Sequence, residues 1–216
     1  HLSSQQKNSQ DLEKNIIDIE NQLSQLTEKL NALASDISQN RKSAVPIFTE
    51  KIEKILKKLG LEKAKIEVEL TDNENFNKFG KEHIQLLFQA NTGFPLKPIQ
   101  NAISGGERSR VMLSIKKIIA ENTELPTLIL DEIDTGVSGK VANEIGNVMQ
   151  EMAENMQLIV ITHLAQVAAK GSNNYKVIKE DVNGKTQSTI IPLNEEQKLQ
   201  EIAQLLSGDT ITDAAI

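Results

Sequence analysis

The sequence of 216 residues has no cysteine, no tryptophan and a single tyrosine. Without cysteine it forms no disulfide, which suits a reducing compartment, so we expect a cytoplasmic protein. No apolar run approaches the ~20 residues that cross a bilayer, and the first residues lack the charged-then-apolar pattern of a signal peptide. The sequence therefore predicts neither export nor insertion into a membrane.

Positive charge is also in short supply, because 24 Lys and Arg stand against 30 Asp and Glu, a net charge of −6. Proteins that bind nucleic acid over a general surface are usually basic, so any DNA contact is expected to be local or outside this chain. The scarcity of aromatic residues leaves no stacking platform for single strands. Hydrophobic residues make up 38% of the chain, enough for one globular domain with an extension.

No segment matches the phosphate-binding loop Gly-x4-Gly-Lys-Ser/Thr. The tripeptide Gly184-Lys185-Thr186 is similar, but Lys179 stands where the first glycine is required, and the tripeptide falls in a predicted hairpin. The chain starts at His1 and ends at Ile216, inside an apolar run. We therefore expect a C-terminal fragment that cannot turn over ATP by itself.

The first forty residues carry a heptad pattern, with apolar residues in alternating steps of four and three. The residues of this heptad stripe are Leu12, Ile16, Ile19, Leu23, Leu26, Leu30, Leu33 and Ile37. Such a narrow stripe predicts a coiled coil with a partner helix, although one helix of a bundle is an alternative. Pro46 predicts a helix boundary, because proline disfavours helix in the residue before it. We expect an arm segment over 1–45 and a globular part over 46–216.

The globular part starts with a predicted helix whose apolar face ends at Gly60. Alternation over Ile66–Leu70 and an apolar run over Ile84–Ala90 predict two antiparallel strands, separated by a polar loop, Thr71–Gly80. A hairpin is expected around Asn183-Gly184, and the pattern of Glu195–Leu206 predicts a last amphipathic helix.

Between these parts, apolar strands alternate with helices. Helices are predicted over Glu107–Ala120 and Lys140–Ala153, and strands over Thr127–Leu130 and Leu158–Ile161. Strands that are apolar throughout, alternating with helices, are typical of a parallel sheet that helices cover on both faces. The sequence therefore predicts an α/β fold.

Three polar motifs lie at the start of a predicted helix and at the ends of two predicted strands. Ser104, Gly105, Gly106 and Glu107 precede a helix, where free amides and the helix dipole favour a phosphate; a Ser cap on a Gly-rich turn is the alternative. Asp131 and Glu132 end one strand and His163 follows another. In a parallel sheet these strand ends face the ligand crevice. Taken singly, the acidic pair could belong to a turn, and the histidine could be an ordinary surface residue. Found together in this order, the three motifs favour a phosphoryl-transfer site.

These motifs resemble those of the ABC ATPase superfamily and, within it, the RecN family of SMC-like DNA-repair ATPases. Ile103–Glu107 matches the signature segment, with Ile103 where Leu is usual; Leu128–Glu132 matches the Walker B motif and His163 the switch histidine. Three further segments are specific to the RecN family, and the resemblance runs from about Ser43 onward. They are Gly93–Pro98, Asp131–Gly139 and Thr162–Ala169.

The resemblance implies the C-terminal lobe of an ABC ATPase head that acts with ATP and Mg²⁺ in double-strand break repair. Asp131 would hold Mg²⁺, Glu132 would be the catalytic base, and His163 would contact the γ-phosphate. Ser104, Gly105, Gly106 and Glu107 would bind nucleotide held by the opposite head. Thr135–Ser138 would form an interface loop, although Ser138 replaces a common aspartate.

The resemblance also implies association with the nucleoid and several partners. They are the N-terminal half of the same head with the Walker A loop, a second head in an ATP-sandwich homodimer, an antiparallel coiled-coil helix, and DNA. Two alternatives remain: the head of an SMC-like chromosome-organising ATPase, whose arms would be much longer, and a non-catalytic coiled-coil scaffold. The adjacent acids Asp131 and Glu132 count against the scaffold.

Overall fold

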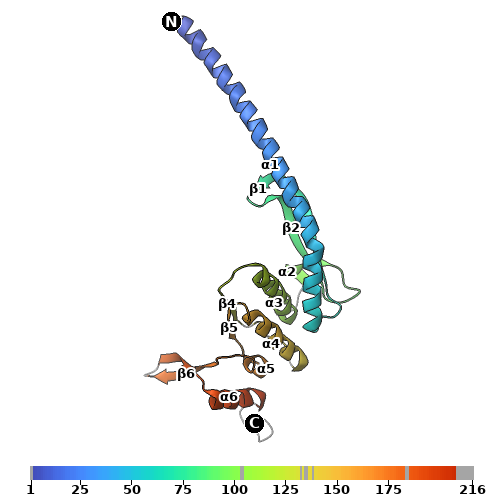
Figure 1. Cartoon of the computed structure of the whole chain (residues 1–216), viewed down its shortest axis with the longest axis vertical. Coiled ribbons are helices and arrows are strands. Elements are labelled where there is room, and N and C mark those ends of the chain that lie inside the picture. The colour runs from blue at the N-terminus through green and yellow to red at the C-terminus, as the bar shows by residue number, and fades with distance from the viewer. Residues whose placement is uncertain are drawn as a thin grey trace. The chain divides into compact units, whose positions relative to one another are not determined.

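A computed structural model describes residues 2–102, 105–131, 133, 136–137, 139–182 and 185–207. Figure 1 shows its helices and strands in chain order. The chain divides into two compact units, one of residues 1–49 and 68–86, the other of residues 50–67 and 87–216. The expected α/β fold class is confirmed. In the described part of the chain, no helix has the length and apolar character needed to cross a membrane.

The first helix, α1, runs without interruption over Leu2–Lys58. The predicted boundary at Pro46 is therefore wrong, because this proline lies inside the helix. Pro46 is exposed, so the carbonyl that loses its helical hydrogen bond four residues earlier, that of Lys42, can bind water instead. The division into an arm over 1–45 and a head over 46–216 stays a prediction.

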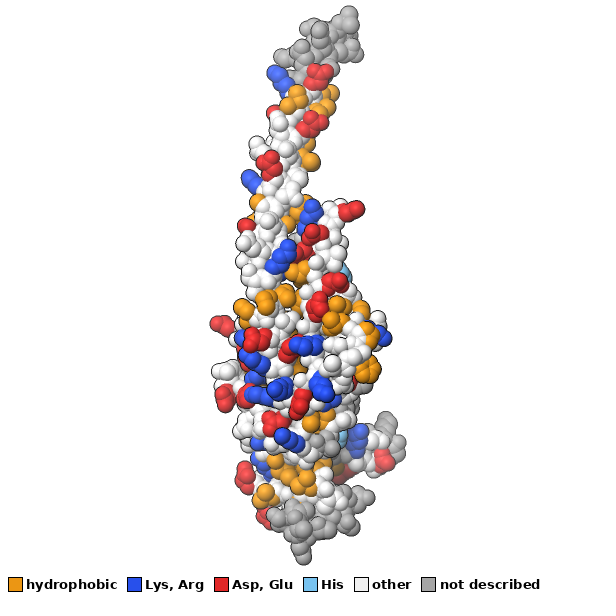
Figure 2. All heavy atoms as spheres, turned by 90° about the vertical axis from the view of Figure 1, so that its right-hand side faces the viewer, with side chains coloured by type: hydrophobic (Ala, Val, Ile, Leu, Met, Phe, Trp, Pro, Cys, Tyr) orange, Lys and Arg blue, Asp and Glu red, His pale blue; other side chains and the backbone are white. Residues whose placement is uncertain are grey.

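Every residue of the heptad stripe is exposed, from 37% at Ile37 to 65% at Leu23. Figure 2 shows apolar side chains recurring among polar ones along α1. The stripe is too apolar to be a free helix surface, which supports the coiled-coil prediction.

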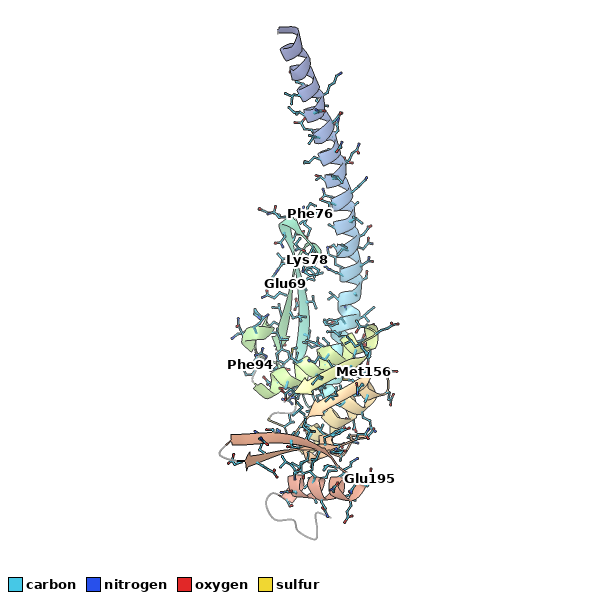
Figure 3. All side chains as sticks on the ribbon, turned by 90° about the vertical axis from the view of Figure 1, so that its left-hand side faces the viewer. Glu69, Phe76, Lys78, Phe94, Met156 and Glu195 are labelled. Atoms are coloured by element: carbon cyan, nitrogen blue, oxygen red, sulfur yellow. The ribbon has the colours of Figure 1, made fainter. Side chains whose placement is uncertain are left out.

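The next two strands, β1 (Lys65–Asn77) and β2 (Gly80–Gln89), are hydrogen-bonded neighbours joined by the turn residues Lys78 and Phe79. They form a hairpin as expected, but the polar loop predicted over Thr71–Gly80 is wrong, since most of it is strand. Figure 3 labels Glu69 and Phe76 on β1 and Lys78 at the turn. Lys78 lies 4.8 Å from the ring centroid of Phe79, and Lys81 lies 5.3 Å from that of Phe76.

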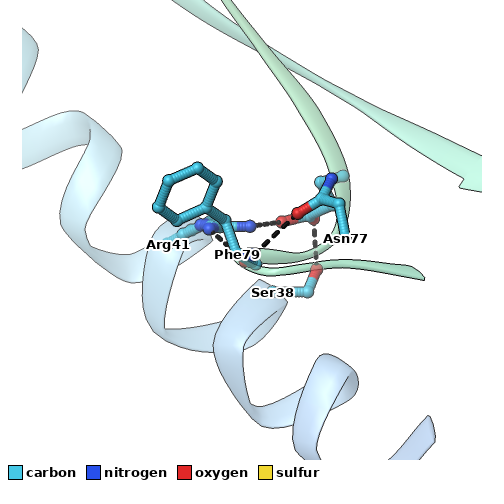
Figure 4. A network of polar contacts seen from close by, with 5 residues as sticks. Ser38, Arg41, Asn77 and Phe79 are labelled. Carbon is cyan, nitrogen blue, oxygen red and sulfur yellow. Dashed lines mark hydrogen bonds and ion pairs between the residues drawn. The ribbon is translucent and has the colours of Figure 1, made fainter. Parts of the chain in front are cut away.

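A polar cluster holds this hairpin to α1 within the first compact unit (Figure 4). The buried carboxylate of Glu82 accepts a hydrogen bond from Ser38 Oγ at 2.6 Å and one from Arg41 Nη1 at 3.0 Å. Arg41 Nη2 also donates to the carbonyl of Phe79 at 2.6 Å. We call Ser38, Arg41 and Glu82 the hairpin clamp.

The second compact unit contains most of the core. After β3 (Lys97–Pro98) and α2 (Ile99–Ala102), α3 (Gly105–Asn122) precedes β4 (Thr127–Asp131), and α4 (Gly139–Ala153) precedes β5 (Gln157–Ile161). The strands β4 and β5 pair in parallel, as expected. The fully buried side chains of this unit come from α1 and the turn after it, α3, β4 and α4; they include Ile52, Leu56, Leu59, Val111, Leu113, Leu130 and Ile145.

One face of the β4–β5 sheet is exposed, although helices were expected to cover both faces. Leu130 is fully buried on the face toward the helices, whereas Ile129, Ile159 and Ile161 are 59%, 44% and 54% exposed. Ile129 and Ile159 are direct register partners, so these exposed side chains lie together. We call Ile129, Ile159 and Ile161 the open sheet face. In the described residues, the predicted cover on both faces is found on one face only.

The remaining elements are α5 (Ala165–Ala168), β6 (Tyr175–Val182), β7 (Lys185–Pro192) and α6 (Glu195–Ser207). The antiparallel register of β6 and β7 pairs Val182 with Lys185, which confirms the predicted hairpin around residues 183–184. An ion pair between Lys176 and Glu201 joins β6 to α6.

Candidate functional site

The ends of β4 and β5 bring two predicted site residues to the same edge of the sheet. Asp131 is the register partner of Ile161, and His163 follows Ile161 by two residues. Both Asp131 and His163 are exposed. The Thr162 hydroxyl accepts a hydrogen bond from the Leu164 amide at 3.0 Å, which shapes the turn that carries His163. The parallel pairing thus places Asp131 and His163 at the same edge of the sheet, whereas Glu132 lies outside the described residues.

Asp131 also shares a side of the sheet with the open sheet face. Side chains alternate along a strand, so Ile129 and Asp131 point to one side and Leu130 to the other. The exposed carboxylate therefore lies beside an exposed apolar surface. A group bound at Asp131 would be approached from the side that the helices leave uncovered.

The start of α3 carries the described part of the signature segment, Gly105, Gly106 and Glu107; Ser104 lies outside the described residues. Gly105 is exposed, and a Cβ placed on it would meet nothing within 4 Å. The first backbone N–H groups of a helix have no intrahelical acceptor, and the helix dipole makes this end electropositive. The exposed start of α3 is therefore suited to an anionic ligand, and the predicted nucleotide contact there stays a prediction.

The loop after β4 passes beside this helix start. Gly136 has φ +72°, and a Cβ built on it would lie 3.8 Å from the Cα of Gly106. The loop was predicted over Thr135–Ser138; Thr135 and Ser138 lie outside the described residues. The structure therefore brings Gly136 of the predicted interface loop next to the signature segment.

Arg110 holds the start of α3 in place, a role that was not predicted from the sequence. Its Nε donates to the carbonyl of Gly106 at 3.1 Å, and its Nη1 donates to the carbonyl of Leu59 at 3.0 Å. Burial lowers the pKa of this guanidinium, and the nearby charge of Glu107 opposes that effect. Arg110 directly precedes the apolar residues of α3, but local sequence could not identify its partner, which lies 51 positions away.

A second polar network lies nearer the C-terminal ends of α3 and α4. Lys117 Nζ is 3.0 Å from Glu151 Oε2, and Lys58 Nζ is 3.7 Å from Glu151 Oε1. The hydrogen bond from Lys117 holds the pKa of Glu151 below its ordinary value, although partial burial opposes it. A cavity of about 270 Å³ borders Lys117, Glu151 and Met156. This cavity lies away from the signature segment and contains none of the predicted site residues.

The described residues fit a site in which nucleotide phosphates supply much of the metal coordination. No group of three or more metal-binding side chains is found among them. Mg²⁺ is usually held by one or two carboxylates together with phosphates and water, so the single exposed carboxylate of Asp131 is compatible with it. The predicted Mg²⁺ role of Asp131 stays a prediction.

Comparison with solved structures defines the class of fold. One match comes from work on ATP-driven dimerization and DNA-stimulated activation of SMC ATPases; it has 17% identity and a TM-score of 0.55, and covers 81% of this chain and 99% of that one. The Smc head domain of Pyrococcus yayanosii with its coiled coil and joint has 19% identity and a TM-score of 0.60, covering 80% of this chain and 32% of that one. The fold is that of an SMC ATPase head.

The chain belongs to the RecF/RecN/SMC N-terminal domain family, whose model matches residues 3–188. Its relatives include the DNA repair protein RecN of Vibrio cholerae, 34% identical over 88% of this chain and 37% of the relative, so the chain is RecN-like. RecN of Bacillus subtilis is 34% identical over 83% of this chain and 34% of the relative. The chain thus spans about a third of the length of these relatives.

Proposed function

We propose that this chain is the C-terminal part of a RecN-like ATPase head, completed by an N-terminal half that carries the Walker A loop. The observation that carries this proposal is the parallel register of β4 and β5, in which Asp131 pairs with Ile161. This register delivers Asp131 and His163 to one edge, and Glu132 follows Asp131 in the sequence. A phosphoryl-transfer site needs this combination of metal ligand, base and phosphate sensor.

Each residue then has a distinct role in ATP hydrolysis. Asp131 would hold Mg²⁺, which neutralises charge on the phosphates when bound. Glu132 would orient the attacking water and accept its proton, while His163 would donate a hydrogen bond to the γ-phosphate. Ser104, Gly105, Gly106 and Glu107 would bind the nucleotide of a second head across an ATP-dependent dimer. The exposed start of α3 supports that last role, because a partner can reach it.

The open sheet face supports the proposed N-terminal half. Three exposed isoleucines side by side are costly in water, since each buried apolar side chain is worth about 1.5–3 kcal/mol. An N-terminal half that adds to this sheet would cover them and would bring its phosphate loop to the side on which Asp131 lies. This chain by itself is therefore expected to be inactive.

The names of the relatives and the heptad stripe of α1 support a role in DNA repair. The relatives in Vibrio cholerae and Bacillus subtilis are named DNA repair proteins. We infer the same role here, with ATP-driven closing and opening of two heads acting on DNA during double-strand break repair. The heptad stripe would pair with an antiparallel helix from the N-terminal part of the same protein.

The test is ATP turnover by this chain, by the N-terminal half, and by their mixture. We expect turnover only in the mixture, and its loss with Glu132→Gln. Glu124→Gln is the matched control, because Glu124 is an exposed glutamate in the loop before β4 and its charge is removed in the same way. A mixture that is folded and associated yet inert, with and without DNA, would refute the proposal.

The exposed heptad stripe favours one further candidate, a non-catalytic scaffold that dimerises through α1. A double variant, Leu23→Asp with Leu26→Asp, separates the two functions. Its control, Asn21→Asp with Gln25→Asp, adds the same charge off the stripe. If the stripe variant abolishes all self-association and ATP has no effect on that of the wild type, the scaffold is the better description. ATP-dependent head dimers that survive the stripe variant support the ATPase.

A further inference from the structure

The end of α1 needs a hydrogen-bond donor that the helix itself does not supply. The last carbonyls of a helix have no intrahelical partner. Here the chain turns at Gly60, with φ +79°, and the Leu61 amide closes the turn by donating to the Leu56 carbonyl at 2.9 Å. The Leu59 carbonyl lies within this turn, where none of the turn's backbone hydrogen bonds between described residues reaches it, and the side chain of Leu59 is fully buried. The donor that reaches this carbonyl is Arg110 Nη1, at 3.0 Å.

Arg110 makes its second bond at the signature segment. Its Nε donates to the carbonyl of Gly106, one helical turn before it, at 3.1 Å. One guanidinium thus joins the C-terminal end of α1 to the first turn of α3. Two fixed N–H directions serve two carbonyls at once, which a lysine ammonium cannot reproduce with the same rigidity. A cation at the end of α1 also complements the negative end of the helix dipole.

The packing around Gly60 leaves little freedom at this junction. A Cβ on Gly60 would lie 2.8 Å from Cγ2 of Val141 and 3.6 Å from Nη1 of Arg110. Val141 belongs to the first turn of α4, shortly after the loop that contains Gly136. The end of α1 and the starts of α3 and α4 therefore meet at Arg110 and Gly60, all within the second compact unit.

We propose that Arg110 is a positioning residue that ties the signature segment to the C-terminal end of α1. This inference rests on the proposed function, because it gives the signature segment a role in ATP turnover. Arg110 contacts main-chain carbonyls and is not assigned to the nucleotide. Its effect is to fix where the glycines of the signature segment stand relative to the last turn of the arm helix.

Hydrogen exchange in this chain tests the tie without requiring ATPase activity. Arg110→Met keeps the length of the apolar stem and removes the donors. We expect exchange to become about tenfold faster at two places together, the Leu59 and Leu61 amides and the amides of Ser109 and Val111. Lys116→Met is the control: it removes a cation from the same helix, and within the described residues Lys116 makes no side-chain hydrogen bond or ion pair. Unchanged exchange at Leu59 and Leu61 would overturn the inference.

ATP turnover in the mixture with the N-terminal half then tests the consequence for activity. We expect Arg110→Met to lower kcat about tenfold while KM for ATP changes less than about twofold, since the nucleotide is held mainly by the other half. Arg110→Lys should restore part of kcat. A fall in thermal stability with kcat unchanged would leave Arg110 a purely structural residue and overturn the inference. If the wild-type mixture is itself inert, the proposed function fails, and the exchange result still decides whether the tie exists.

Discussion

Gly136 lies against Gly106, with 3.8 Å between a Cβ built on the first and the Cα of the second. The contact joins the loop that follows β4 to the start of α3, two stretches that are far apart in the sequence. In the proposed head dimer, both stretches face the partner head. Because the two stretches are adjacent, we expect a displacement of one to move the other.

Gly136 therefore offers a test of this contact. Its φ of +72° costs an alanine roughly 1–2 kcal/mol, although 3.8 Å leaves room for the methyl group. We expect Gly136→Ala to lower ATP turnover of the completed head about tenfold, and Gly136→Asn to be milder because asparagine adopts this conformation more readily. The measurement is steady-state turnover beside thermal unfolding.

A matched control for Gly136 exists in the same compact unit. Gly93 has φ +94°, and a Cβ on it would meet nothing within 4 Å. Gly93→Ala should lose similar stability and leave turnover unchanged. Equal losses of turnover in the two alanine variants would show that backbone strain alone, and not the contact with Gly106, explains the effect.

The open sheet face predicts a binding defect without a folding defect. Ile159 is 44% exposed in this chain, so Ile159→Asp should change its melting temperature little. Burying the new carboxylate under the N-terminal half would be costly, and we expect affinity for that half to fall at least about a hundredfold. Titration calorimetry measures this affinity. Ile84→Asp, which changes an exposed isoleucine in the other compact unit, should bind normally; equal affinities for both variants would contradict the proposed cover.

The hairpin clamp predicts a local loss of stability. Glu82→Gln removes the charge that receives hydrogen bonds from Ser38 and Arg41, and we expect it to lower the opening free energy of the β1–β2 amides by about 1.5–3 kcal/mol. Hydrogen exchange of the hairpin measures this quantity. Glu50→Gln breaks an exposed pair with Lys54 on the surface of α1 and should have no measurable effect.

The same carboxylate predicts a pH dependence. The hydrogen bond from Ser38, with further help from Arg41, lowers the pKa of Glu82 although its burial opposes this. A lowered pKa in the folded state means that the stabilisation is present above the ordinary glutamate value of about 4.3 and is lost as pH falls through the folded value. Hairpin protection should therefore decline below about pH 4 in the wild type. The Glu82→Gln variant should show less of this decline, and an identical pH profile would contradict the assignment.

Local patterns predicted the elements that are built on apolar periodicity. The strand before Asp131, the helix after Gly139 and the strand before His163 appear within one or two residues of their predicted bounds. Each strand is an unbroken apolar run that ends at a polar residue, and the helix has a regular apolar face, so local spacing is enough to identify them. The placement of Asp131 and His163 at one edge follows from parallel pairing, which the alternation of strands and helices already indicated.

Two predictions failed in segments whose structure does not depend on a periodic apolar pattern. Thr71–Asn77 is strand although its side chains are all exposed, because pairing with β2 holds it there. The helix continues through Pro46 because its flanking turns are intact, and Thr49 donates to the carbonyls of Val45 and Pro46. The spacing of apolar residues predicts neither the strand over 71–77 nor the continuation of the helix through Pro46.

The sequence by itself determined the heptad stripe, the α/β order of elements and the kinds of residue at the strand ends, since each depends on the spacing of residues within one segment. Only the tertiary structure decided that Arg110 reaches Leu59, that Gly136 meets Gly106 and that Ile129, Ile159 and Ile161 share an exposed face. These relationships depend on how separate elements pack. That packing minimises exposed apolar surface and unsatisfied carbonyls over the whole unit, which no single segment encodes.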